Sequence, residues 1–428
     1  MKTPEEFLES HGFVLAQDIN RQALIGAFMD EMEAGLQGKP SSLMMVPSYV
    51  GVCGKVKEGA KAVVLDAGGT NFRGAIVSIP PSISERRNQS MPGIKGRVDE
   101  ETFYKTFVNE VERLRGAASV KKIGWCFSYP AEATKDLDAK LVRWTKGVDA
   151  PEIVGQCVGA ELLKRLGGGE VAIVNDTVAT LLAAKATEGD KTYSSYIGFI
   201  LGTGTNAAYV EKNRNITKVE GLDSDGEMII NAESGAFNKI ETSEFDKALD
   251  EKTNNKGQQI LEKLISGAYL GNIGLEIYKV AAKEGMFSGK ASSAITGLGQ
   301  IETMDFDNFV ACYKKEGRDN ILDTIFADPE DAKMARRLGL PVFERAAILT
   351  AVHIAAFAIK SGEGMSAEAP IAINADGSTY YKTRAIPFAD TVKKALDDML
   401  VARRNIHYAI TPQVDDAPMV GAAIAAML

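Results

Sequence analysis

Two turns rich in small residues, far apart in the chain, share one pattern. Residues 66–71 read Asp-Ala-Gly-Gly-Thr-Asn and residues 202–206 read Gly-Thr-Gly-Thr-Asn, and each turn joins two apolar runs. Glycine lets backbone N–H groups approach a phosphate closely, and threonine and asparagine side chains can donate further hydrogen bonds. One such turn is weak evidence, but the repetition predicts a duplicated fold that holds one polyphosphate from both sides.

The carboxylate of Asp66 stands at the end of the apolar run before the first turn. A carboxylate is costly there unless it is paired or lies near a cation, which fits an Mg²⁺ site with intervening water molecules. The alternative is a tight hairpin closed by an aspartate-mediated turn, and the repeated pattern favours the phosphate site. The sequence contains neither the glycine fingerprint of dinucleotide-binding folds nor a lysine-containing P-loop.

Asn175 and Asp176 follow a buried strand at 171–174 and precede a helix at 177–186. An ionised carboxylate at a cleft could take the proton of a substrate hydroxyl as its oxygen bonds to phosphorus. A nearby helix N-terminus would keep that carboxylate ionised. Asparagine and aspartate are also favoured helix caps, and this segment alone does not decide between a cap and a catalytic base.

Further carboxylates, amides and a lysine could serve a polyol, because each of these groups can bond a sugar hydroxyl. Asn231 and Glu233 follow the strand at 228–230, and Glu262 lies in the run 257–263. From spacing alone Glu262 reads as a surface helix residue, and Lys146 in the segment 141–147 reads as a solvated loop lysine.

The composition of the chain excludes several classes of protein. With 428 residues, 45% of them hydrophobic and 25% charged, we expect two or three globular domains, and the net charge of −8 argues against a nucleic-acid binder. No apolar run approaches the roughly 20 residues that span a bilayer, and the N-terminus lacks a secretory signal. The histidines are isolated, so a transition-metal site is not expected. We expect buried thiols in a reducing cytoplasm for all four cysteines: Cys53, Cys126, Cys157 and Cys312.

Hydrophobic periodicity predicts a mixed α/β sheet structure flanked by helices. Asp328 before Pro329 predicts a helix N-cap. The expected helices cover 1–48 (ended by 35–40), 97–116, 155–166, 177–186, 257–283, 329–338, 342–360, 389–399 and 420–428. The expected strands cover 63–80 (two strands and their turn), 123–128, 171–174, 196–201, 207–211, 228–230, 371–375 and 406–411. No low-complexity linker separates the halves, so we expect two domains that share a cleft.

Taken together, these segments resemble the eukaryotic-type hexokinase family, which includes the glucokinases, and we expect a bacterial member. The resemblance runs from about residue 40 to 285 and weakly to the end. Its motifs are collinear and lie at 44–50, 65–73, 125–130, 144–147, 174–178, 201–211, 230–237 and 262–271.

The resemblance implies a duplicated actin-like ATPase (ribonuclease H-like) α/β fold whose two domains close on a sugar. The small domain would comprise 53–178 plus 418–428, and the large domain 1–52 plus 179–417. The implied activity is transfer of the ATP γ-phosphate to the 6-hydroxyl of glucose or a related hexose. Asp176 would be the base, and Lys146 would bridge the sugar and the transferring phosphate.

The family pattern also assigns binding residues by position, and it replaces the surface interpretations of Glu262 and Lys146. The sugar contacts would be Ser128, Thr145, Lys146, Asn175, Asp176, Asn231, Glu233 and Glu262. ATP and its Mg²⁺ would be held by Asp66 (through water), Gly68, Gly69, Thr70, Asn71, Arg73, Gly202, Thr203, Gly377, Ser378 and Gly421. The expected partners are the hexose and the nucleotide, with no nucleic acid and no membrane, in a monomer or homodimer.

The chain departs from the family pattern in three places. Ser234 stands where the family has an aromatic residue, and the stretch from 378 to 388 is longer than usual. Only the second half of the family's Gly-Ser-Gly-Lys-Gly-Ala-Ala survives, at 416–423. These departures leave two alternatives open: a kinase of the same fold with another hexose or phosphate donor, and an inactive sugar sensor.

Overall fold

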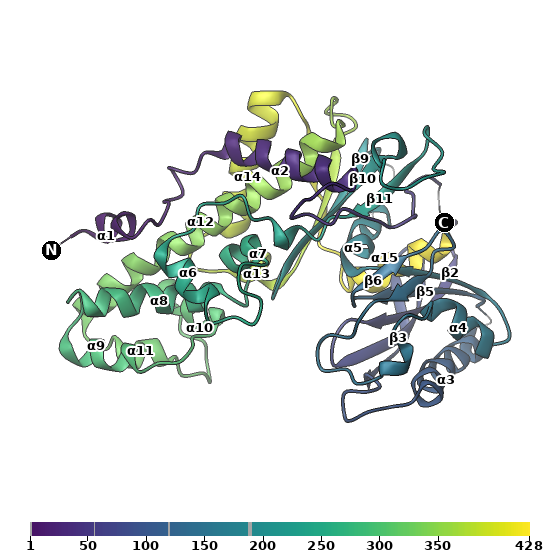
Figure 1. Cartoon of the computed structure of the whole chain (residues 1–428), viewed down its shortest axis with the longest axis horizontal. Coiled ribbons are helices and arrows are strands. Elements are labelled where there is room, and N and C mark those ends of the chain that lie inside the picture. The colour runs from purple at the N-terminus through teal and green to yellow at the C-terminus, as the bar shows by residue number, and fades with distance from the viewer. Residues whose placement is uncertain (1, 55, 119, 187–190) are drawn as a thin grey trace.

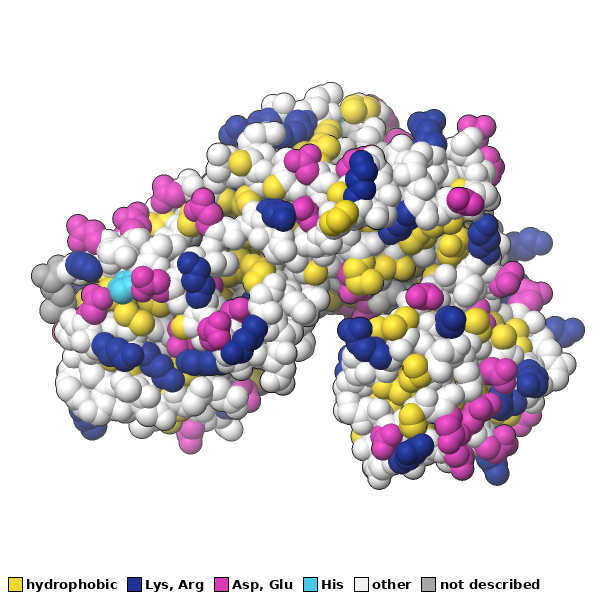
Figure 2. Space-filling view, viewed as in Figure 1, with side chains coloured by type: hydrophobic (Ala, Val, Ile, Leu, Met, Phe, Trp, Pro, Cys, Tyr) yellow, Lys and Arg dark blue, Asp and Glu magenta, His cyan; other side chains and the backbone are white. Residues whose placement is uncertain are grey.

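The computed structural model describes residues 2–54, 56–118, 120–186 and 191–428. Each of the two main β-sheets belongs to its own lobe, and the smaller lobe stands apart from the helical end of the larger lobe (Figure 1). Figure 2 shows the surface hollowed between these lobes.

The sheet of the smaller lobe has five strands in the order β4-β3-β2-β5-β8. Side chains of β2 alternate between two apolar clusters: Val63 and Leu65 face helices α3 and α4, whereas Ala62 and Val64 face the opposite side. Both faces are therefore covered. The strands are β2 (Lys61–Ala67), β3 (Asn71–Ser78), β4 (Ser82–Ser90), β5 (Lys122–Phe127) and β8 (Glu170–Val174), beside a small β6 (Ala131–Ala133) and β7 (Ala139–Leu141) hairpin.

The sheet of the larger lobe has six strands in the order β1-β11-β10-β9-β12-β13. The β9–β10 pair is an antiparallel hairpin with β12 parallel to β9, just as β2–β3 is a hairpin with β5 parallel to β2. The unit around each glycine-rich turn is thus repeated. The turns at 66–71 and 202–206 are called the first and second phosphate turns after their predicted role. The strands are β1 (Val46–Pro47), β9 (Ser195–Leu201), β10 (Thr205–Lys212), β11 (Glu227–Asn231), β12 (Ile371–Asp376) and β13 (Tyr408–Ile410).

Two helices, α5 (Asp176–Lys185) and α15 (Ala417–Met427), pack against each other between the sheets. Glycines permit the close approach: a Cβ at Gly198 would lie 2.5 Å from the backbone nitrogen of Leu181, and a Cβ at Gly421 would overlap the carbonyl oxygen of Ala179. One apolar cluster runs from the first sheet through both helices to the second.

Most of the remaining helices belong to the larger lobe, and several of them, such as α8, α9 and α11, lie at the end of the molecule far from the smaller lobe (Figure 1). The remaining helices of the larger lobe are α1 (Pro4–Ser10), α2 (Arg21–Leu36), α6 (Glu244–Asp250), α7 (Ile260–Ile265), α8 (Leu270–Lys283), α9 (Gly289–Thr296), α10 (Thr303–Val310), α11 (Ile321–Ile325), α12 (Pro329–Ser361), α13 (Ser378–Lys382) and α14 (Phe388–Leu396), while α3 (Glu100–Ala118) and α4 (Val158–Arg165) belong to the smaller lobe.

Several expected element boundaries were wrong. The helix expected at 1–48 is two helices, because Gly12 takes a φ of 74° after α1 and Asn20 caps α2. The helix expected at 257–283 is broken into α7 and α8 at Gly267, which packs on the second phosphate turn. Strand β4 was missed because its side chains are mostly polar and exposed.

Helix α12 joins two helices that were expected to be separate. It continues through Pro341, and the carboxylate of Asp328 accepts hydrogen bonds from the first-turn N–H groups, which confirms the predicted cap. In the part of the chain that the structure describes, α12 alone is long and apolar enough to cross a membrane, with a mean hydropathy of 1.7 over its most apolar window. The expectation of no such run was wrong, but 89% of that window is buried inside the protein, as in a core helix.

The expectation that all four cysteines are buried was also wrong. Cys126 is buried and Cys157 partly so, whereas Cys53 and Cys312 are exposed. The reducing cytoplasm was expected because the thiols were expected to be buried, so the exposed Cys53 and Cys312 give no support to that expectation.

Candidate functional site

The predicted site residues gather where strands of both sheets end. Strands β2, β5 and β8 run parallel, so their carboxyl ends place Asp66, Ser128 and Asn175 along one edge of the first sheet. Strands β9 and β12 are also parallel and bring the second phosphate turn beside Gly377. Ligands bind at such carboxyl ends in open α/β sheets.

The structure assigns the helix cap of the Asn175–Asp176 segment to Asn175. Asn175 is the N-cap of α5, and its Oδ1 accepts a 2.8 Å hydrogen bond from the N–H of Thr177. The carboxylate of Asp176 is therefore free of the capping task. Burial raises the pKa of Asp176, while the ammonium of Lys146 and the hydroxyl of Ser128 act in the opposite direction.

Lys146 is anchored between the sugar loop and the first phosphate turn. Its Nζ donates to the carbonyl oxygen of Ser128 at 3.1 Å and to that of Gly68, and it lies 5.4 Å from the ring centroid of Tyr129. The backbone of Lys146 takes a left-handed φ of 58°, and the neighbouring Trp144 donates from Nε1 to the carbonyl of Ala150 at 2.7 Å. Lys146 is nevertheless an exposed loop residue, and its predicted role at the transferring phosphate stays a prediction.

The larger lobe contributes a cluster of amides and carboxylates. Asn206 Nδ2 donates to Asn231 Oδ1 at 2.8 Å, and Asn231 Nδ2 donates to Glu233 Oε1 at 2.7 Å. Glu262 accepts the N–H of Thr205 at 3.1 Å and is half-buried, so the surface-helix interpretation of this residue was wrong.

These carboxylates form an electrostatically coupled group. Burial raises the pKa of Glu233 and of Glu262, and the charge of Asp176 across the cleft raises that of Glu233 further. The acidic side chains of both lobes therefore face the same cleft. Such a group, supplemented by amides, can accept and donate hydrogen bonds to several hydroxyls of one polyol.

Asn206 is a site residue that the sequence analysis did not select. Besides Asn231, its amide donates to Glu233 at 3.4 Å, and its Oδ1 accepts the N–H groups of Ala207 and Ser234 at 2.8 and 3.1 Å. The fully buried Ser234 accepts the Ala207 N–H at 2.9 Å, a bond that an aromatic residue could not supply. The signal was present in the Thr-Asn ending shared by both turns.

The first phosphate turn is fixed by a hydrogen bond to its backbone, and its last two residues are exposed. Tyr129 donates to the carbonyl oxygen of Gly69 at 2.7 Å, while Thr70 and Asn71 are exposed. The cation beside Asp66 is Arg73, whose Nε lies 2.9 Å from Asp66 Oδ2 and whose Nη1 lies 2.5 Å from Asp416 Oδ1.

The donor set around Asp66 fits Mg²⁺ held mainly by phosphates and water. No group of three or more metal-ligating side chains occurs among the residues that the structure describes. Mg²⁺ is usually bound through one or two carboxylates plus substrate phosphates, and Asp66, whose Oδ2 is paired with Arg73, would contact it through water.

The second phosphate turn is enclosed by two other segments. The carbonyl oxygen of Gly202 accepts the N–H of Gly267 and the hydroxyl of Thr379, both at 2.8 Å, and the carbonyl of Thr203 accepts the N–H of Ala268 at 3.0 Å. Gly377, with a φ of 113°, packs so closely on Leu201 that a Cβ would overlap its carbonyl. Four predicted nucleotide residues, Gly202, Thr203, Gly377 and Ser378, are thus adjacent.

Gly421, a predicted nucleotide residue, packs two helices together in the structure. This residue is buried in the middle of α15, where its missing side chain allows α15 to contact Ala179 of α5. The position is thus a helix-packing glycine, and its nucleotide role stays a prediction.

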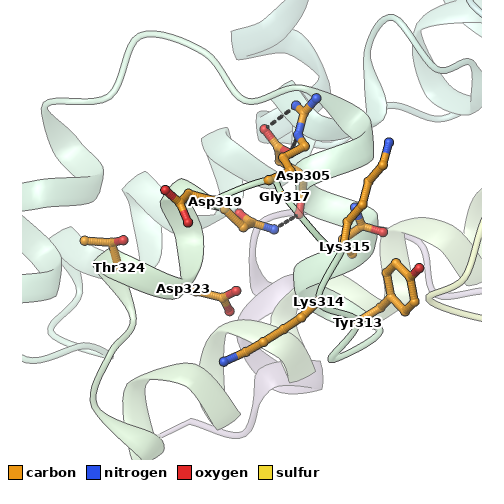
Figure 3. Close-up of a pocket in the computed structure, with 11 residues that line it drawn as sticks. Asp305, Tyr313, Lys314, Lys315, Gly317, Asp319, Asp323 and Thr324 are labelled. Carbon is orange, nitrogen blue, oxygen red and sulfur yellow. Dashed lines mark hydrogen bonds and ion pairs between the residues drawn. The ribbon is translucent and has the colours of Figure 1, made fainter.

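A large pocket lies at the loop between α10 and α11. It has a volume of about 640 Å³ (Figure 3). Its lining, which includes Tyr313, Lys314 and Asp323, shares no residue with the predicted site.

Comparison with known proteins identifies the family. Sequence models described as "Hexokinase" match residues 13–186 and 196–428. This chain belongs to the hexokinase family. Hexokinase-2 of Homo sapiens is 33% identical over an alignment of 386 residues. Hexokinase-7 of Oryza sativa subsp. japonica is 30% identical over an alignment of 437 residues, gaps included, which covers 94% of this chain and 92% of the rice protein. The match to the human enzyme covers 83% of this chain but only 41% of the human protein, so the chain spans about two fifths of that relative's length.

Solved hexokinase structures share the fold of this family member. A hexokinase from Schistosoma mansoni complexed with glucose is 26% identical, with a TM-score of 0.76 and complete coverage of both chains. A ROK hexokinase from Thermus thermophilus, at 15% identity and a TM-score of 0.53, covers 86% of this chain and 98% of its own and shares the fold alone. The predicted fold class, a duplicated actin-like ATPase fold with two domains, is confirmed.

Proposed function

We propose that this hexokinase-family chain transfers the γ-phosphate of ATP to the 6-hydroxyl of glucose or a closely related hexose. The observation that carries the proposal is the position of Asp176 and Lys146 on one lobe, facing Glu233 on the other, with a glycine-rich turn on each side. Phosphoryl transfer depends mainly on positioning and electrostatic stabilisation, which this arrangement supplies.

The hexose would be held by the sugar contacts that the resemblance assigns, joined by Asn206. The proton of its 6-hydroxyl passes to the carboxylate of Asp176 as the hydroxyl oxygen bonds to the γ-phosphorus. The bond from that phosphorus to the bridging oxygen breaks, and ADP leaves with the electron pair. Lys146 offsets the negative charge on the transferring phosphoryl group. Mg²⁺ would neutralise the phosphates, with Asp66 as its protein ligand through water.

The nucleotide would lie between the two turns. We assign Gly68, Gly69, Thr70 and Asn71 on one side and Gly202, Thr203, Gly377 and Ser378 on the other. Arg73 stays in the assignment as a residue that orients Asp66, because its guanidinium bonds Asp66 and Asp416.

A panel of hexoses with MgATP, read by ADP release, tests the proposal. Release with glucose or an epimer is the expected result, and no release with any hexose contradicts it. A second candidate is a kinase with another phosphate donor, favoured by Asp416-Ala417-Pro418 in place of the family's small-residue loop. With glucose fixed, turnover by GTP, ADP or polyphosphate but not ATP would support that candidate, and no product from any donor would support a sugar sensor.

Further assignments belong to the same proposal. We infer a bacterial source, a cytoplasmic location and a monomer or homodimer without nucleic-acid or membrane partners. We retain the division into 53–178 plus 418–428 and 1–52 plus 179–417.

A further inference from the structure

The hydroxyl of Thr379 bonds the second phosphate turn from outside. Thr379 lies in the first turn of α13 and is only 6% exposed, and its Oγ1 donates to the carbonyl oxygen of Gly202 at 2.8 Å. Strand β12 delivers the residue there, because Asp376 is in parallel register with Ile200 of β9.

The same carbonyl has a second donor, the N–H of Gly267 at 2.8 Å. A carbonyl oxygen has two lone pairs, so these two bonds satisfy it. The fit around it is tight: a Cβ at Gly267 would lie 2.6 Å from Thr379 Oγ1 and 2.8 Å from the Gly202 oxygen. Three segments distant in sequence therefore fix one carbonyl group.

A fixed Gly202 carbonyl also fixes the next N–H group. The peptide plane is rigid and trans, so the N–H of Thr203 points opposite to the C=O of Gly202. With that C=O directed at Gly267 and Thr379, the Thr203 N–H points away from these two residues. The glycine at 202 would otherwise let this peptide rotate more freely.

We propose that Thr379 is a positioning residue for the phosphate donor, which orients the Thr203 N–H toward the polyphosphate. The inference rests on the proposed function and deepens it. It adds a side chain outside both turns to the residues that set affinity for the nucleotide.

The variant Thr379→Val removes the hydroxyl and keeps the shape of the side chain, and Thr379→Ser keeps the hydroxyl. We expect Thr379→Val to raise the KM for ATP by about 3–10-fold, the effect of one lost hydrogen bond, with the KM for glucose unchanged within about twofold. Thr379→Ser should restore the wild-type KM for ATP. Thr383→Val is the matched control, because its hydroxyl bonds the carbonyl of Thr379 at 2.7 Å within the same segment and does not reach the turn.

An unchanged KM for ATP in Thr379→Val, an equal rise in both KM values, or no rescue by serine would overturn the proposal. Titration of wild type and Thr379→Val with a non-hydrolysable ATP analogue separates this outcome from failure of the proposed function. If the wild type binds the analogue but phosphorylates no sugar, the proposed function fails while the binding difference still decides the role of Thr379. If Thr379→Val does not fold, Thr379→Ala is measured in the same way.

Discussion

The backbone N–H of Thr205 donates a 3.1 Å hydrogen bond to Oε2 of Glu262, so the second phosphate turn touches a predicted sugar carboxylate. A Cβ at Gly204 would lie 2.5 Å from the same oxygen. The Gly204–Thr205 end of the turn therefore cannot move independently of this carboxylate.

Gly204→Ala should displace Glu262 and raise the KM for glucose by about tenfold, because a hydrogen-bonded charge is pushed out of place. Gly69→Ala in the first turn is the matched control, since a Cβ there meets no atom within 4 Å. That control should leave the KM for glucose unchanged. Steady-state kinetics with each substrate varied checks both, and equal glucose KM values for the two variants would contradict the coupling.

Asp176→Ala should lower kcat by about 10²–10⁴-fold or more because the proton acceptor is lost, while the sugar still binds through its other assigned contacts. A coupled ADP assay measures turnover, and fluorescence of Trp144, adjacent to Thr145, measures glucose binding. Near-normal turnover would remove Asp176 from the role of base.

Asp176→Asn should stabilise the protein at neutral pH. The pKa of Asp176 is raised in the folded state, so the fold loses stability as pH rises from the ordinary aspartate pKa through the raised value. The uncharged amide avoids that loss, and we expect a Tm higher by about 1–3 °C at pH 7. Thermal melts should show that the difference in Tm between variant and wild type shrinks toward pH 4. A lower Tm for the variant than for the wild type at pH 7 would contradict the predicted stabilisation.

The raised pKa of Asp176 also determines the pH at which activity falls on the acid side of the pH profile. A base must be ionised, so kcat/KM should fall as pH drops through the raised pKa of Asp176, at a higher pH than an ordinary aspartate would give. A pH profile of initial rates locates this fall. A fall at the ordinary aspartate pKa would contradict the effect of burial.

Gly421→Ala should destabilise the protein by about 3 kcal/mol or more, because a methyl group there overlaps the Ala179 carbonyl of α5. Gly26→Ala in α2, which meets no atom within 4 Å, should be neutral or stabilising. Denaturant melts compare the two. Normal stability of Gly421→Ala combined with a raised KM for ATP would instead favour the nucleotide role.

The repeated units around the two turns could be predicted from sequence, because apolar runs and glycines are local signals. The break between α7 and α8 could not, since the helical periodicity continues past Gly267 and the interruption comes from packing against Gly202. The bonds from Arg73 to Asp416 and from Thr379 to Gly202 join distant segments, so the spacing of residues in the sequence does not predict them. Asn206 was missed although its turn was selected, because the orientation of its amide depends on Asn231 and Glu233.

The contact of α15 with the first sheet sets an order of events during synthesis. Strands β2 to β8 leave the ribosome long before the 11 residues of α15, which cover one of their faces. Until α15 emerges, Val64 and its neighbours on that face lack their final cover. The smaller lobe therefore cannot finish folding before the larger one has been translated, and a nascent chain halted before α15 would present an apolar surface to chaperones.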